Sequence, residues 1–571
     1  MKINYKQKIA EILQPHMGEM TVEDVLDLIE TPQDSKMGDY ALPCFKLARV
    51  MRKAPPMIAK GIAEAVADEP MFARVEQVNA YVNMFLDREV FAGEVVSEVI
   101  DKGTDYGRSD LGGGRKVIVE YSSPNIAKPF HIGHIRSTVI GNSINNIYDF
   151  LGYDTVRINH LGDYGTQFGK MIVAYRRWGN KDDVIREPIK TLLGYYKKFH
   201  EEADSDPSLE DEARATFTKL EHGEKEEVEL WQWFRDESLK EFNRVYDMLG
   251  ISFDSYNGES FYSDKMPRFV RELEDKGLLE EDEGAKIVRL DDYDLPVALI
   301  TKSDGSTLYI TRDIAAAVYR KETYDFYKNI YVVASQQNLH FQQWIQILEM
   351  MGYEWARDCV HVPFGLVSMA EGTMSTREGR VIFLEDVLNR AVDQTREIIK
   401  EKNVNTENIE ETAAAVGIGA VIFNELSNYR IKDYVFSWEH VLNFEGETGP
   451  YVQYTHARAC SILRNAGEEV VAKAKAGFDP SWITGDSAHE LETLLYQLPD
   501  VIAEAGEKYE PSIVTRHIVD IAQAYNRFYH DEHILTDNED EKIAKVALVM
   551  AAKNAIQVGL HLLGMKAPEK M

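Results

Sequence analysis

The chain has few cysteines, and none of them is paired by its spacing. Three cysteines stand in 571 residues, at positions 44, 359 and 460. Three isolated thiols make no disulfide framework, and no CxxC pair is present to hold zinc. These absences exclude a disulfide-stapled secreted domain and fit a reducing compartment, so we expect a cytoplasmic protein with no structural metal.

Long apolar runs are missing as well. The first residues, MKINYKQKIAEIL, alternate polar and apolar positions at helical spacing and contain no signal-peptide core. We find no apolar run long enough to span a bilayer, and no internal repeat or low-complexity tract. The remaining composition, 44% hydrophobic and 28% charged, is that of an ordinary globular protein. We therefore expect no membrane partner.

Positive charge is also scarce. The chain has 64 Lys and Arg against 95 Asp and Glu, a net charge of −31. A generic nucleic-acid binder needs cations to neutralise phosphates, so we do not expect DNA as a partner. Basic residues do gather locally, in residues 46–53, 176–181 and 458–464. Each of these patches could bind RNA or could be a solvated helix face.

Residues 120–141, EYSSPNIAKPFHIGHIRSTVIG, are the most informative stretch. They follow an apolar run, residues 116–120, that is typical of a buried strand. Pro124 and Pro129 forbid helix in the turn that comes next. Apolar residues at helical spacing from Ile132 onward predict a helix. A strand that passes through a turn into a helix indicates a doubly wound parallel sheet.

His131, Gly133 and His134 fall in the first turn of that helix. The free N–H groups and the positive dipole end of such a turn suit a phosphate. Two imidazoles three residues apart share one face and can donate to phosphate oxygens. The alternative is a metal pair, which would need a third ligand that the scattered cysteines do not offer.

The motif HIGH, residues 131–134, resembles the signature of class I aminoacyl-tRNA synthetases, and its flank SSPNIAKPF is similar to that of the arginyl-tRNA synthetases. The resemblance runs from the N-terminal MGDYALPCFKLARVMRKAP to the ending GLHLLGMKAPEKM. It implies an enzyme that makes arginyl-adenylate and pyrophosphate from L-arginine and ATP, then transfers arginine to the 3′ end of tRNA(Arg). A class I synthetase of another specificity and a catalytically inert tRNA-binding paralogue stay open as alternatives.

A second segment, GTMSTREG at residues 372–379, resembles the KMSKS loop of the same class. Thr373 and Thr376 stand where the general motif has lysines, and the resemblance implies that Lys128 compensates. Mg²⁺ is expected with the substrate ATP, although no dedicated metal ligands are visible. The expected ATP-binding residues are His131, Gly133, His134, Met374, Ser375 and Thr376, and the expected catalytic residues are His131, His134, Lys128, Ser375 and Arg377.

Recognition of arginine calls for a carboxylate and neutral acceptors, because the guanidinium is a planar, permanently charged set of donors. We expect the sheet to resume in residues 295–301, 307–311, 330–334 and 360–365. Tyr309 would then end a strand and Asp313 would begin a helix, so both could face the guanidinium. Residues after other strand ends could hold the α-amino group: Glu120, Ser123, Asn125 and Gln337.

The expected architecture is a multidomain α/β fold. Residues 109–395 form a Rossmann-like catalytic domain with a highly charged helical insertion at about 180–292. Residues 1–108 form an N-terminal α+β domain, and residues 396–571 an all-α bundle. By the resemblance, the first of these two recognises the tRNA D-loop, the second binds the anticodon, and the protein is a monomer.

Aromatic and amide side chains in both outer domains could read unpaired bases. In the strand AYVNMFL two such residues share one face, and others cluster in the C-terminal bundle. An edge strand and an aromatic stripe in a helical core are the alternative interpretations. The candidate tRNA-binding residues are Tyr81, Asn83, Tyr451, Tyr454, Tyr525 and Asn526.

Overall fold

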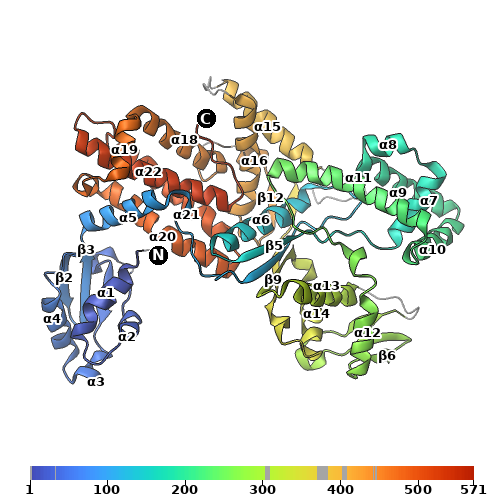
Figure 1. Ribbon diagram of the computed structural model, residues 1–571, viewed down its shortest axis with the longest axis horizontal. Coiled ribbons are helices and arrows are strands. Elements are labelled where there is room, and N and C mark those ends of the chain that lie inside the picture. The colour runs from blue at the N-terminus through green and yellow to red at the C-terminus, as the bar shows by residue number, and fades with distance from the viewer. Residues whose placement is uncertain are drawn as a thin grey trace.

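The structure is a computed structural model with four parts, one of which is inserted into the sequence of the central sheet (Figure 1). A small N-terminal domain lies at one end, a helical bundle lies above it, a parallel sheet lies at the centre, and a largely helical insertion lies at the other end. The structure describes residues 3–32, 34–302, 309–369, 383–401, 408–441, 443 and 446–571.

The N-terminal domain packs helices on a three-stranded antiparallel sheet of order β1-β3-β2. Asn4 and Thr21 cap its first two helices with their side chains. The next helix, α5 (Arg88–Lys102), lies beside the C-terminal bundle and joins the two parts (Figure 1). The elements are α1 (Tyr5–Leu13), α2 (Val22–Leu26), β1 (Tyr40–Pro43), α3 (Leu47–Met51), α4 (Pro55–Ala65), β2 (Phe72–Val78) and β3 (Tyr81–Leu86).

The central sheet is parallel, with order β10-β9-β4-β5. Helices cover it, so β4 is buried along nearly all its length and its sequence is almost continuously apolar. The strand order reverses between β4 and β9, which places a ligand crevice at their carboxyl ends. The elements are β4 (Lys116–Glu120), α6 (Ile135–Phe150), β5 (Asp154–Ile158), α13 (Tyr309–Tyr324), β9 (Lys328–Ala334), α14 (Asn338–Met350) and β10 (Cys359–Phe364).

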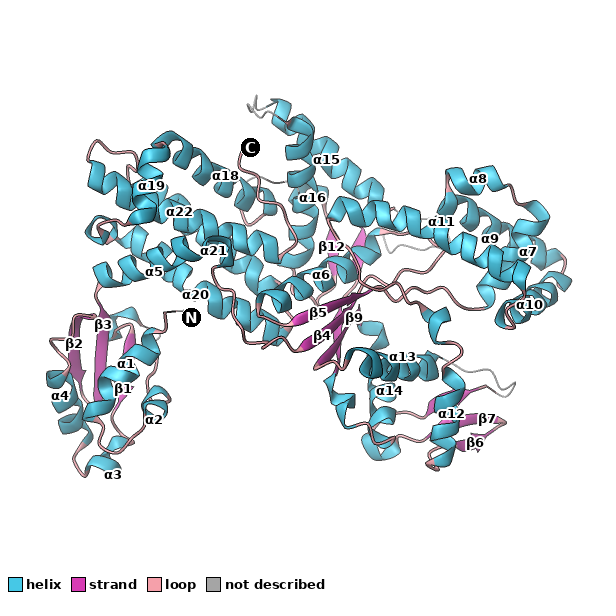
Figure 2. Cartoon of the chain, in the orientation of Figure 1, coloured by secondary structure: helices cyan, strands magenta, loops and turns pink. Residues whose placement is uncertain are grey.

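A long insertion separates β5 from β9. Its first part is helical, and its second part contains a three-stranded antiparallel sheet of order β6-β7-β8 (Figure 2). The elements are α7 (Thr166–Trp178), α8 (Lys181–Arg186), α9 (Pro188–Ser205), α10 (Ser208–Glu221), α11 (Lys225–Leu249), α12 (Met266–Asp275), β6 (Glu280–Asp282), β7 (Ala285–Val288) and β8 (Ala298–Thr301).

The predictions that residues 295–301 and 307–311 form strands of the central sheet are wrong. β8 pairs antiparallel with β7 in the insertion, and residues 309–311 open helix α13 instead of closing a strand. A short apolar run has no feature that tells which sheet it joins, so periodicity could not separate these cases. The parallel sheet resumes only at β9.

The C-terminal part is a helical bundle, as predicted, with one short strand in it. That strand, β12, pairs in parallel with β11, which precedes the second signature. By length and composition α22 could cross a membrane. However, 78% of its apolar 18-residue stretch is buried inside the protein, so α22 is the core helix of the bundle. The elements are β11 (Val367–Met369), α15 (Leu384–Glu401), α16 (Ile409–Ser427), β12 (Tyr434–Phe436), α17 (Trp438–Val441), α18 (Gly449–Ala466), α19 (Glu468–Ala476), α20 (Asp486–Lys508), α21 (Ser512–Asp531) and α22 (Glu539–Leu562).

Candidate functional site

The HIGH segment forms a tight turn that leads into α6. The Gly133 N–H donates to His131 Nδ1 at 3.0 Å, and the His131 N–H donates to His134 Nδ1 at 3.1 Å. The two rings lie 4.0 Å apart. Because Nδ1 of His131 accepts a backbone hydrogen bond, the neutral His131 ring carries its proton on Nε2. The Nδ1 of His134 also lies 3.3 Å from the His131 carbonyl, so the geometry of the turn admits both tautomers of His134.

Burial decides the charge of these rings. It lowers the pKa of His131, and it lowers the pKa of His134 to about 3, with the neighbouring His131 adding to the effect. Both imidazoles are thus neutral at physiological pH. Neutral donors can bind a phosphate oxygen without repelling Mg²⁺ or another cation on the same phosphate.

The second signature, with Met374, Ser375, Thr376 and Arg377, lies outside the described residues. The chain on both sides of it is described. Strand β11, which precedes the second signature, lies against the HIGH turn. After it, residue 383 forms an antiparallel bridge with residue 131, and the Leu384 N–H donates to the Phe130 carbonyl at 2.9 Å. The described residues on both sides of the second signature thus contact the first signature or its neighbour Phe130.

The turn between β4 and the HIGH segment has an unusual backbone. Ser122, Ser123 and Ala127 all have positive φ, at 70°, 47° and 57°. This conformation is costly for non-glycine residues and is held here by hydrogen bonds, such as that from the Ala127 N–H to Ser238 Oγ at 3.2 Å. The strained turn leaves Asn125 and Lys128 exposed beside the signature.

The expected amino-acid ligands gather at the carboxyl ends of β4 and β9. Glu120 ends β4, and Ser123 follows with a hydroxyl that has no hydrogen-bond partner among the described residues. Asn125 pairs through its backbone with Gly162. A Cβ at Gly162 would lie 2.3 Å from Asn125 Oδ1, so any larger residue there would force the Asn125 side chain to move. Gln337 ends the short turn after β9 and is exposed.

Tyr309 and Asp313 lie four residues apart in the first turns of α13, on one helix face. Tyr309 is 65% exposed, and the Asp313 side chain is 30% exposed. His340 of α14 donates through Nε2 to the Asp313 carboxylate. The expected pair is therefore close and accessible, although it comes from a helix and not from a strand end.

Two buried arginines of α13 are functional candidates that sequence reasoning missed. Arg320 is paired with Glu120, 2.6 Å from Nη2 to Oε2. Arg312 is paired with Glu259, 3.1 Å from Nη1 to Oε1, and its guanidinium lies 5.0 Å from the Tyr164 ring centroid. Their signal in the sequence is weak but present, since both stand among the alanines of an apolar helix, TRDIAAAVYR.

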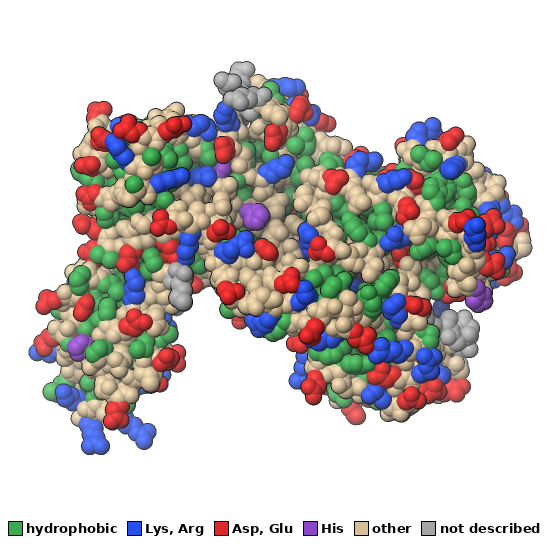
Figure 3. Space-filling model, viewed as in Figure 1, with side chains coloured by type: hydrophobic (Ala, Val, Ile, Leu, Met, Phe, Trp, Pro, Cys, Tyr) green, Lys and Arg blue, Asp and Glu red, His purple; other side chains and the backbone are tan. Residues whose placement is uncertain are grey.

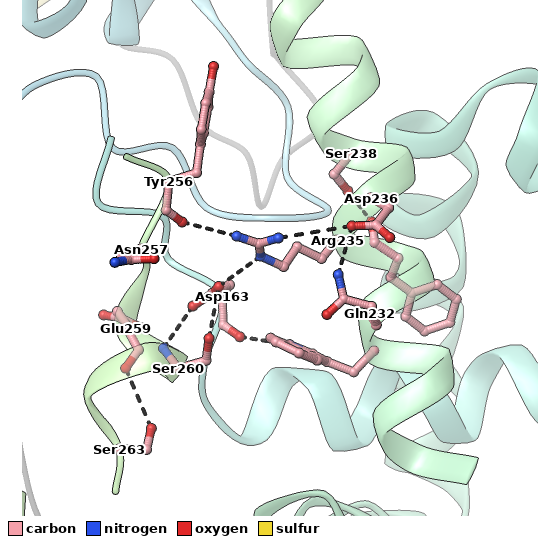
Figure 4. Close-up of polar contacts among 12 residues, drawn as sticks. Asp163, Gln232, Arg235, Asp236, Ser238, Tyr256, Asn257, Glu259, Ser260 and Ser263 are labelled. Carbon is pink, nitrogen blue, oxygen red and sulfur yellow. Dashed lines mark hydrogen bonds and ion pairs between the residues drawn. The ribbon is translucent and has the colours of Figure 1, made fainter. Parts of the chain in front are cut away.

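Asp163, in the loop that follows β5, serves the fold (Figure 4). Its carboxylate accepts from the Ser260 N–H at 2.9 Å, from the Ser260 hydroxyl at 3.0 Å and from Arg235 Nε at 3.2 Å. Its carbonyl accepts from Trp231 Nε1 at 2.8 Å. Asp163 is fully buried, so it ties the loop after β5 to α11 and to the turn at Ser260.

The candidate tRNA-binding residues differ widely in exposure. In the N-terminal domain Tyr81 is half-buried and meets exposed Phe45 edge-on, whereas Asn83 is only 1% exposed. Beside Phe45, α3 and the residues that flank it carry exposed cations, which form the basic tip of the domain (Figure 3). These cations are Lys46, Arg49, Arg52 and Lys53.

In the C-terminal bundle Tyr454 is exposed and borders a cavity of about 620 Å³ together with Arg458 and Tyr529. Asn526 accepts from Arg458 at 2.8 Å and donates to the Tyr451 hydroxyl at 2.8 Å, so it orients that arginine. Tyr525 is fully buried and packs in the bundle core. Tyr525 therefore has no surface on which a base could stack.

No cluster that could hold a metal is found within the described part of the chain, where three or more His, Cys, Asp or Glu would have to converge. A magnesium ion that accompanies ATP would draw its ligands largely from the phosphates and water, which fits this arrangement.

Family models match almost the whole chain. Residues 4–86 match the arginyl tRNA synthetase N-terminal domain, residues 95–438 the class I (R) tRNA synthetase catalytic domain, and residues 452–571 the DALR anticodon-binding domain. The arginine–tRNA ligases of Halothermothrix orenii and Clostridioides difficile are 57% and 56% identical to this chain, over the full length of both proteins.

Solved structures agree in fold. The arginyl-tRNA synthetase of Thermus thermophilus superposes with a TM-score of 0.78 at 24% identity, and that of Plasmodium falciparum with 0.78 at 22%. Each match covers all of both chains. At these identities the likeness concerns the arrangement of domains.

Proposed function

We propose that this chain, which belongs to the arginyl-tRNA synthetase family, binds its substrates at the carboxyl edge of the parallel sheet. It is an arginine–tRNA ligase, and its substrates are L-arginine, ATP and tRNA. The observation that carries the proposal is that α6 and α13 both contact the carboxyl edge of the sheet. Ser137 of α6 accepts from the Ser122 N–H after β4, Arg320 of α13 is paired with Glu120, and Asp313 of α13 is paired with His340 after β9. The finer assignments that follow are our proposals.

Activation needs alignment and charge stabilisation more than acid–base chemistry. The carboxylate of arginine attacks the α-phosphorus of ATP, the bond to the bridging oxygen breaks, and pyrophosphate leaves with the electron pair. The nucleophile is already an anion, so no general base is required. His131 and His134 donate through Nε2 to the phosphates, and Lys128 supplies the cation that Thr373 and Thr376 do not. Mg²⁺, when bound with ATP, would neutralise further charge.

The arginine side chain is placed against α13. Asp313 accepts from the guanidinium, and the Tyr309 hydroxyl adds a neutral acceptor. Glu120, Ser123, Asn125 and Gln337 are placed around the α-amino group. The second signature residues Met374, Ser375, Thr376 and Arg377 complete the ATP site in this proposal.

Transfer follows at the 3′ end of the tRNA. A hydroxyl of the terminal ribose attacks the carbonyl carbon of arginyl-adenylate, AMP leaves, and the hydroxyl proton is released. We assign Tyr81 and the basic tip to the D-loop, and Tyr454 with Arg458 to the anticodon, since exposed aromatics beside cations suit unpaired bases. We expect a cytoplasmic monomer.

Arginine-dependent exchange of pyrophosphate into ATP, with and without cognate tRNA, tests the proposal. Exchange only with tRNA would indicate that RNA completes the site, and exchange without tRNA would indicate a site complete in the protein. An absence of exchange under both conditions, with tRNA still bound, would overturn the proposed site.

A further inference from the structure

The ion pair between Arg320 and Glu120 lies directly beneath the proposed arginine site. Arg320 comes from α13, seven residues after Asp313 and so on the same helix face. Its side chain is 0% exposed, whereas that of Glu120 is 9% exposed. The only open side of the pair is therefore its carboxylate, at the end of β4 where the ligand crevice begins.

Arg320 is held on several sides. Its Nη2 lies 2.6 Å from Glu120 Oε2 and 3.4 Å from His160 Nδ1, which follows β5. Its guanidinium carbon lies 5.4 Å from the centroid of the Tyr331 ring in β9. Three neighbouring strands thus fix this one side chain at the edge where substrates bind.

The balance of charges near the site suggests a role for the Arg320–Glu120 pair in substrate binding. Glu120 and Arg320 cancel each other, as do Glu259 and Arg312, whereas Asp313 is paired with the His340 imidazole and with no Lys or Arg among the described residues. One carboxylate can balance one guanidinium, but the α-ammonium of the substrate then needs an acceptor that brings no further net charge. A carboxylate has about four lone-pair sites, so Glu120 can accept from Arg320 and from an ammonium at once.

We propose that Arg320 is a positioning residue for arginine binding, which holds the Glu120 carboxylate in the orientation that accepts from the α-ammonium of the substrate. The inference rests on the proposed placement of arginine at this edge. Without Arg320 the Glu120 carboxylate would lose the ion pair that fixes its orientation. A carboxylate without a fixed orientation is a poorer acceptor for the ammonium, because ordering it on binding costs conformational entropy.

Equilibrium binding by calorimetry to the full-length protein tests this inference with three ligands. These are L-arginine, 5-guanidinopentanoate, which lacks the α-amino group, and L-citrulline, which lacks the guanidinium charge. We expect the wild type to prefer arginine over 5-guanidinopentanoate at least tenfold. In Arg320→Met this preference shrinks at least fivefold, while the preference for arginine over citrulline, which Asp313 sets, stays as in the wild type.

Arg268→Met is the matched control. It removes an ion pair to the same helix, Arg268 to Glu322 at 2.9 Å, but both side chains are about half exposed, so no preference should change. Arg320→Lys keeps the positive charge but loses the planar guanidinium, so it should give a preference between those of the wild type and Arg320→Met. Thermal melting shows whether Arg320→Met is folded, and Arg320→Lys replaces it in the test if it is not.

The outcomes separate the two proposals. If the wild type does not distinguish arginine from 5-guanidinopentanoate, the placement of the α-amino group at Glu120 is wrong. If the wild type does and the Arg320 variants distinguish them equally well, Arg320 is a structural residue and the inference is overturned. A loss confined to the citrulline comparison would keep Arg320 as a positioning residue but move Glu120 to the guanidinium.

Discussion

At the scale of single residues, the two signature histidines act as neutral donors. Burial lowers the pKa of both imidazoles, and their Nδ1 atoms accept hydrogen bonds from the backbone of their own turn. The bond that shapes the turn leaves the proton of His131 on Nε2. The Nδ1 of His134 also lies 3.3 Å from the His131 carbonyl, so the turn fixes the position of that ring and not its tautomer.

His134→Ala should slow adenylate formation, because one donor to the phosphates is lost. The expected cost is about 2–4 kcal/mol in the transition state, the usual value for an oxyanion-type donor. Pre-steady-state rates of activation measure it, with arginine affinity as the internal control. A collapse of arginine affinity would instead place His134 in the amino-acid pocket.

His134→Gln would keep a donor and should retain more activity than the alanine variant. Since the pKa of His134 lies at about 3, the activation rate should show no inflection from this group between pH 5.5 and 8. A rate that follows a protonation step of His134 in that window would contradict a neutral donor.

Asp313→Ala should raise the KM for arginine strongly while the KM for ATP changes little. The reason is that a buried or half-buried guanidinium loses its charged partner, and hydrogen bonds between charged groups are worth about 1.5–3 kcal/mol each. Steady-state exchange with varied arginine and varied ATP separates the two constants. Asp325→Ala, on an exposed carboxylate just after α13, is the control and should leave both unchanged.

At the scale of elements, a buried joint connects the signature helix to the C-terminal bundle. Arg136 of α6 donates to the Gly365 carbonyl at 2.9 Å and to the Lys432 carbonyl at 2.8 Å. Glu425 of α16 lies 3.6 Å from it and accepts from the Tyr434 hydroxyl of β12. The helix that carries HIGH and the strand that precedes the second signature are thus braced against the bundle.

Glu425 should make the stability of this joint depend on pH. Burial raises its pKa to about 8, against 4.5 in the unfolded chain. The folded state therefore binds the extra proton between these values, so its contribution is present below pH 4.5 and is lost as the pH rises through 8. The slope is at most about 1.4 kcal/mol per pH unit.

Glu425→Gln keeps a neutral side chain of the same shape and should flatten this part of the stability profile. Urea unfolding at several pH values between 5 and 8 measures the effect. Glu410→Gln, on the exposed face of the same helix, is the control and should keep the wild-type slope. An unchanged slope in Glu425→Gln would show that this carboxyl does not titrate in that range.

At the scale of the whole molecule, an acidic protein must bind an acidic RNA. The net charge is −31, but exposed cations gather at the tip of the N-terminal domain (Figure 3). Exposed Arg464 and Lys570 also border the cavity beside Tyr454. These two regions lie in different domains, and we expect one tRNA to contact both of them. Local cations within an acidic surface favour binding in one orientation over non-specific attachment.

Binding of tRNA should weaken steeply with salt, because phosphate contacts release counterions. Replacing Arg49, Arg52 and Lys53 together by Gln should lower the affinity and reduce the slope of log K against log salt. Filter binding from 50 to 300 mM salt measures both. Lys60→Gln, an exposed lysine of α4 paired with Glu64, is the control, and a flat response in the wild type would rule out phosphate contacts as the main attraction.

The sequence by itself determined the enzyme class and the general architecture. HIGH with its Pro-bracketed flank and the helical C-terminal part could be predicted because they depend on local rules of turns, caps and periodicity. Tyr309 and Asp313 were correctly seen as close neighbours for the same reason, although the strand assigned before them was wrong. The second signature was identified from sequence alone, and its residues stay a prediction.

Only the tertiary structure decided which polar residues face substrates and which serve the fold. Tyr525 and Asn83 were candidate tRNA-binding residues in sequence, but both are buried in the structure. Arg320, Arg136 and Glu425 showed no motif, since their meaning depends on partners about 200 to 300 residues away. Local spacing reveals what a helix or strand can present, whereas long-range packing sets the burial and charge that decide its use.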